Sequence, residues 1–81
     1  MAGYLPDARR HAEKIENYYE HAGDKGYAQA VYHWDQLASL VFSAMNSKRY
    51  KNEAPVINSI RKSMQQKMDE MKLREKGSNN K

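Results

Sequence analysis

Apolar side chains recur every three or four residues along three stretches of this chain, and this spacing is the feature that most restricts its fold. Residues at this spacing lie on one face of an α-helix. The most apolar of the three stripes consists of Tyr27, Ala30, Val31, Trp34, Leu37, Ala38, Val41, Ala44 and Met45. We therefore predict a helix over about 25–46 that lies centrally and packs against both of its neighbours.

Two flanking stripes have the same period. The first comprises Ala8, Ala12, Ile15, Tyr18, Tyr19 and Ala22, and the last comprises Val56, Ile57, Ile60, Met64, Met68 and Met71. They predict helices over about 6–22 and 53–75. A glycine-containing segment and a polar segment separate the three stripes, and short connections of this kind join antiparallel neighbours in bundles.

The sequence thus predicts an all-α fold, an up-down-up antiparallel three-helix bundle that spans residues 1–76. Residues 77–81, Gly-Ser-Asn-Asn-Lys, have the composition of a disordered tail or of the start of a linker. A chain of 81 residues is large enough for one small domain, and a core of this size leaves little room for a deep catalytic pocket.

Several chemistries are disfavoured by the residues present. The chain has no cysteine, so it has neither disulfides nor thiol nucleophiles. Its histidines, His11, His21 and His33, share no metal-binding spacing, and no serine has a base at a helical spacing that would form a catalytic triad. We expect no metal, no cofactor and no enzymatic activity. No apolar stretch approaches the roughly 18–20 residues of a membrane span, which predicts a cytoplasmic protein without a membrane span.

The charge is uneven along the chain. Residues 1–47 carry four Lys/Arg and six Asp/Glu, whereas residues 48–81 carry ten Lys/Arg and four Asp/Glu. Cations grouped near an aromatic ring are typical of nucleic-acid binding. The candidates for this role are Lys48, Arg49, Tyr50, Lys51 and Lys62. One hypothesis is therefore a stand-alone small helical protein, of a phage or bacterial kind, that binds nucleic acid or inhibits a partner protein through its basic end.

The last stripe contains Met64, Met68 and Met71 at helical spacing, with Arg61 and further basic residues nearby. Methionine is flexible and recurs on surfaces that bind apolar peptides. A second hypothesis is a groove beside the third helix that accepts an amphipathic helix of a partner, with basic residues on its rim. The same stripe would also suit self-association.

The segment from Asp24 to Val31 and the run from Ile60 to Asp69 resemble the corresponding segments of MIT domains, the microtubule-interacting and trafficking modules. The resemblance extends over about residues 7–75. It implies a three-helix bundle that binds helical C-terminal tails of ESCRT-III proteins. By position it places Met68 and Asp69 in the peptide groove, with Met64 and Met71 beside them, and Ile15 on a second groove.

Overall fold

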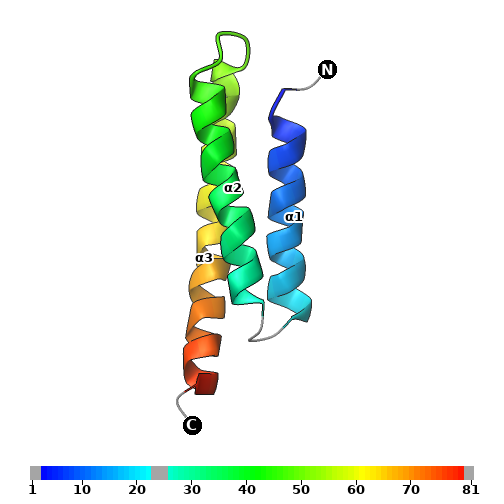
Figure 1. Cartoon of the computed structure of the whole chain (residues 1–81), viewed down its shortest axis with the longest axis vertical. Coiled ribbons are helices and arrows are strands. Elements are labelled where there is room, and N and C mark those ends of the chain that lie inside the picture. The colour runs from blue at the N-terminus through cyan, green and yellow to red at the C-terminus, as the bar shows by residue number, and fades with distance from the viewer. Residues whose placement is uncertain (1–2, 23–25, 80–81) are drawn as a thin grey trace.

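The computed structural model describes residues 3–22 and 26–79 and shows three helices that lie side by side (Figure 1). In chain order the elements are α1 (Leu5–His21), α2 (Tyr27–Met45), the short 3₁₀ helix η2 (Lys51–Glu53) and α3 (Ala54–Asn79). The described residues contain no β-strand. The connection between α2 and α3 lies at the same end of the bundle as the beginning of α1, and α3 ends at the opposite end. The prediction of an all-α chain with three helices is confirmed.

The helix boundaries follow the predictions closely, with one clear exception. The first two predicted helices are correct to within two residues at each end. The third continues to Asn79, so the prediction of a disordered tail is wrong for residues 77–79, while residues 80–81 lie outside the described part of the chain. Extending an existing helix by one residue is easier than starting one, and a single glycine near its end costs only about 1 kcal/mol.

All three apolar stripes meet along the axis of the bundle. The buried residues are Ala8, Ala12, Ile15, Ala30, Leu37, Ala44, Ala54, Ile57, Met64, Met68 and Met71. No polar or charged side chain is buried among the described residues. Five of the buried positions are alanine, whose small side chain permits close approach of neighbouring helices. The four largest fully buried side chains, Ile15, Leu37, Ile57 and Met71, fill the remaining space.

Polar contacts close the two ends of the bundle. At one end the backbone N–H of Tyr4 donates a hydrogen bond to Glu53 Oε1 at 2.9 Å, and the rings of Tyr4 and Tyr50 meet edge to face with centroids 5.7 Å apart. Near the other end the hydroxyl of Tyr19 donates to Glu70 Oε1 at 2.9 Å, and the guanidinium of Arg74 lies 4.6 Å from the centre of the Tyr19 ring. These contacts tie α1 to α3 and to the segment just before it.

Candidate functional site

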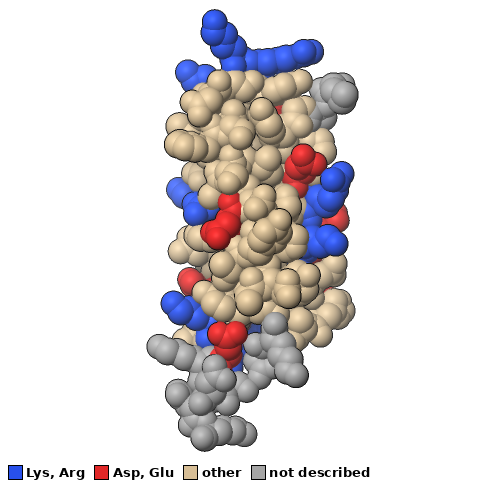
Figure 2. Space-filling view, in the orientation of Figure 1, with Lys and Arg blue, Asp and Glu red and all other residues tan. Residues whose placement is uncertain are grey.

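Helix α2 has an unusually uncharged surface. Asp35 is the only Asp, Glu, Lys or Arg among its 19 residues. Tyr32, Phe42 and Met45 are exposed, and Phe42 leaves 69% of its surface in solvent. The face of the molecule that carries α2 shows a broad area without Lys, Arg, Asp or Glu, and basic residues gather at the end where α2 connects to α3 (Figure 2). Contiguous exposed apolar area is a common feature of surfaces that bind other molecules.

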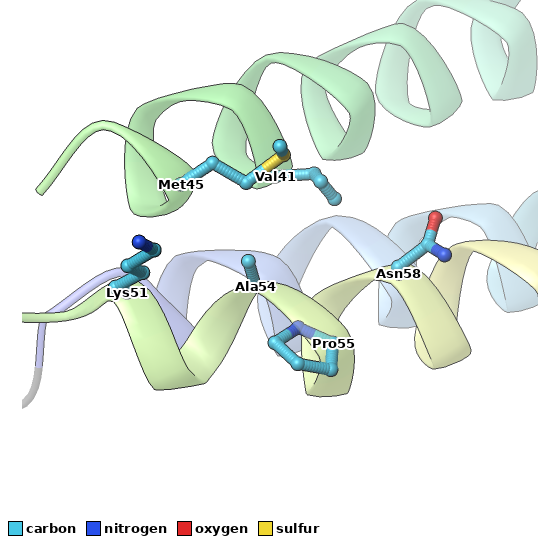
Figure 3. A pocket seen from close by; sticks show the side chains of 6 residues that line it. All are labelled: Val41, Met45, Lys51, Ala54, Pro55 and Asn58. Atoms are coloured by element: carbon cyan, nitrogen blue, oxygen red, sulfur yellow. The ribbon is translucent and has the colours of Figure 1, made fainter.

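One hollow of about 520 Å³ lies between the last turns of α2 and the beginning of α3. Val41 and Met45 reach into it from α2, and Ala54 and Pro55 contribute apolar surface from α3 (Figure 3). Lys51 and Asn58 are the polar residues of its lining. The hollow therefore combines an apolar floor with one cation and one amide, which suits an apolar side chain that has a carboxylate neighbour.

A second hollow, of about 160 Å³, lies between the first turns of α2 and the later part of α3. Its lining residues are Tyr27, Val31, Trp34 and Asp35 from α2 and Gln65, Met68 and Asp69 from α3. The two carboxylates make this hollow acidic, whereas the first contains a lysine. Because both hollows lie between α2 and α3, we treat them as two parts of one feature, the α2–α3 groove.

Trp34 and Arg61 meet between the two parts of the α2–α3 groove. The indole Nε1–H of Trp34 donates a hydrogen bond to the backbone carbonyl of Arg61 at 3.0 Å, and the guanidinium carbon of Arg61 lies 3.9 Å from the centre of the indole ring. Arg61 Nε is buried and has no hydrogen-bond partner among the described residues. The stack therefore holds the Arg61 guanidinium at the middle of the groove. Its Nε–H donates to no acceptor among the described residues.

The structure separates the residues that were predicted to line a peptide groove. Met68 and Asp69 line the acidic part of the α2–α3 groove, and Arg61 lies at its middle. Met64 instead lines another hollow, of about 440 Å³, together with residues of α1. Met71 and Ile15 have no exposed surface, so the prediction that they contact a partner is wrong for this packing.

The reason for this error is that a helical stripe records the face of a helix but not what covers that face. Met64, Met68 and Met71 lie on the face of α3 that turns toward the axis of the bundle, and each exposes less than a tenth of its surface. The groove is lined in part by residues of the α2 stripe that was predicted to pack against neighbouring helices, notably Val41 and Met45. The signal that could have identified them is the near absence of charge from 27 to 45, because the side of α2 that faces solvent is then formed mainly by uncharged residues.

The basic residues that were predicted to contact nucleic acid lie in two places. Lys48, Arg49 and Lys51 are exposed together at the end of the bundle, whereas Lys62 follows about three helical turns after Lys51. Tyr50 packs against Tyr4, so part of its ring is not available for stacking on a base. The structure thus brings three of the four cations together and uses the aromatic residue for internal packing.

A pair of histidines joins α1 to α2 on a different side of the molecule. The Nδ1 atoms of His11 and His33 lie 2.9 Å apart, a hydrogen bond that requires one ring to donate and the other to accept. Burial lowers the pKa of His33 below 6.5, and the nearby positive charges of His11 and Lys14 lower it further. Protonation of both rings would abolish the hydrogen bond and place two cations in contact.

Acidification from pH 7.5 to 5.5 is therefore expected to lower the free energy of unfolding. In the unfolded chain His33 takes up its proton near pH 6.5, whereas in the folded chain it does so only at a lower pH. The contribution of unprotonated His33 to the free energy of unfolding is complete above pH 6.5, and it is lost as the pH falls below that value. Urea unfolding at both pH values would measure it. His33→Asn should reduce the pH dependence, while the same change at exposed His21 should not; equal curves for wild type and His33→Asn would contradict the prediction.

Residues 3–22 and 26–79 contain neither a candidate membrane span nor a candidate metal site. No helix within these ranges is both long enough and apolar enough to cross a membrane. Within the same ranges no three His, Cys, Asp or Glu side chains come together in a group that could hold a metal ion.

Comparison of this chain with protein-family models, with curated proteins and with solved structures finds no match.

Proposed function

We propose that this protein is a non-catalytic interaction module that binds an amphipathic helix of a partner protein in the α2–α3 groove. The observation that carries this proposal is the exposed apolar surface of α2 beside the groove, above all Phe42 and Met45, in a helix with a single charged residue. An apolar helix face that enters such a groove buries its anchors at intervals of three or four residues. Burial of apolar area would supply most of the binding free energy.

The arrangement of the groove supports a helix as the ligand. The groove follows two neighbouring helices, and charged residues from η2 and α3 stand beside its apolar surface. In an up-down-up bundle, a fourth helix in this position would extend the packing of the other three. The resemblance to MIT domains suggests the C-terminal tails of ESCRT-III proteins as the partner class, with binding in the cytoplasm.

Titration of the protein with fluorescent ESCRT-III tail peptides, followed by anisotropy, tests the proposal. We expect saturable binding with a Kd on the order of micromolar, about −8 kcal/mol, that persists at high salt because apolar contacts dominate. Met45→Glu places a charge on the apolar surface and should weaken binding at least about tenfold. Leu73→Glu is the matched control, because Leu73 is also exposed but does not line either part of the groove.

Two outcomes would contradict the proposal. The first is the absence of saturable binding to every tail peptide, and the second is equal affinity of wild type and Met45→Glu. A parallel titration with a short DNA duplex tests the other hypothesis. Nucleic-acid binding that falls steeply with salt and requires Lys48, Arg49 and Lys51 would identify the basic end as the functional surface instead. Sedimentation at several protein concentrations would show whether the apolar surface serves self-association.

A further inference from the structure

The α2–α3 groove has opposite charges at its two ends. Lys51 lines the end nearest the α2–α3 connection, and exposed Lys48 and Arg49 lie in that connection. Asp35 and Asp69 line the other end, and both are exposed. None of these five side chains forms an ion pair within 4 Å in the described part of the chain, so each can interact with a ligand.

The middle of the groove is also positive. Arg61 is held against Trp34, with a buried Nε that lacks an acceptor, and Lys62 is exposed beside it. Apart from Glu53, whose carboxylate accepts the hydrogen bond from the Tyr4 backbone N–H, the charged side chains from the middle to the α2–α3 connection are cationic. At the opposite end Lys72 follows one turn after Asp69, but it does not line the hollow that contains the two carboxylates. A docked helix meets cations along one half of its length and carboxylates at the far end.

We infer that the groove fixes the direction of the docked tail, which lies parallel to α2 with its acidic C-terminal end and terminal carboxylate over Lys51, Lys48 and Arg49. This inference rests on the proposed function and adds the chemistry and orientation of the ligand. The C-terminus of a helix carries the negative end of the helix dipole, and a chain terminus adds a full negative charge there. The helix dipole and the terminal charge both favour binding of the C-terminal end of the tail at the cationic end of the groove. The positive N-terminal end of the ligand helix then lies over Asp35 and Asp69.

A pair of designed peptides tests this inference. Both are the same 18-residue amphipathic helix, with leucine and alanine on one face, lysine in the first turn and glutamate in the last turn. One ends in a carboxylate and the other in an amide. At low salt we expect the carboxylate form to bind about three- to fivefold more tightly, which is the effect of one exposed charge interaction. Lys51→Gln should remove most of this difference, whereas the matched change Lys72→Gln should preserve it.

A spin label at the peptide N-terminus gives an independent readout of direction. In the inferred orientation the label broadens the backbone amide signals of Tyr27 and Val31, and it leaves those of Met45 and Asn58 sharp. Tight binding with equal affinity for both peptides, or broadening at Met45 and Asn58, would overturn the inferred direction while the proposed docking function stands. If neither the designed peptides nor the tail peptides bind, both the docking function and the direction are wrong.

Discussion

Truncation of Leu37 to alanine is expected to lower the free energy of unfolding by about 3 kcal/mol. Leu37 has no exposed surface and lies near the middle of α2, where the helix contacts both of its neighbours. The change removes buried methyl groups and leaves a cavity that helices can fill only in part. In a domain of this size such a loss is a large share of the total stability, which is typically about 5–15 kcal/mol.

Phe42 provides the matched control for Leu37, because it lies in the same helix and is mostly exposed. Phe42→Ala should change the free energy of unfolding by less than about 0.5 kcal/mol, since most of the ring already contacts water. Urea unfolding followed by circular dichroism would measure both variants. A larger loss for Phe42→Ala than for Leu37→Ala would mean that α2 is rotated relative to the packing described here.

Replacement of Trp34 by alanine is expected to cost about 2–4 kcal/mol, slightly less than is typical for a fully buried tryptophan. The variant loses the apolar contact of a half-buried indole, the hydrogen bond to the Arg61 carbonyl and the stack with its guanidinium. Trp34→Phe keeps much of the ring contact but removes the N–H donor, so it should cost about 1 kcal/mol. Thermal and urea unfolding would rank the two variants.

A double-mutant cycle with Arg61→Ala separates the stack from the rest of the tryptophan's contribution. If the guanidinium contributes through the ring, the combined variant should lose about 0.5–1 kcal/mol less than the sum of the single changes. Additive losses would show that Arg61 and Trp34 act independently. The Arg61 side chain would then be available to a ligand without any change in the position of the indole.

The periodicity of the chain predicted the three helices for a physical reason. Apolar residues at helical spacing are buried together efficiently only when the segment forms a helix and packs that face against another surface. It also identified Ile15, Leu37, Ile57 and the three methionines as members of apolar faces. The site was predicted less well. Met68 and Asp69 line the α2–α3 groove and Arg61 stacks on Trp34, whereas Met71 and Ile15, which were assigned to a partner, are covered by the bundle itself.

The difference has a physical cause. The spacing of apolar residues along the sequence determines that a residue lies on the apolar face of its helix. The sequence alone contains that information. Whether water, another helix or a ligand covers the face depends on how the helices cross and how closely they approach. The alanines at Ala8, Ala12, Ala30, Ala44 and Ala54 allow close approach, which brings the methionines of α3 into the core.

By itself the sequence thus determined the helical class, the extent of α1 and α2, the absence of thiol chemistry and the concentration of positive charge after residue 47. Only the tertiary structure decided that His11 meets His33, that Arg61 stacks on Trp34 and that the exposed apolar surface belongs to α2. Each of these features joins residues more than 20 positions apart or depends on what a neighbouring helix leaves uncovered. Periodicity within a helix contains no information about either.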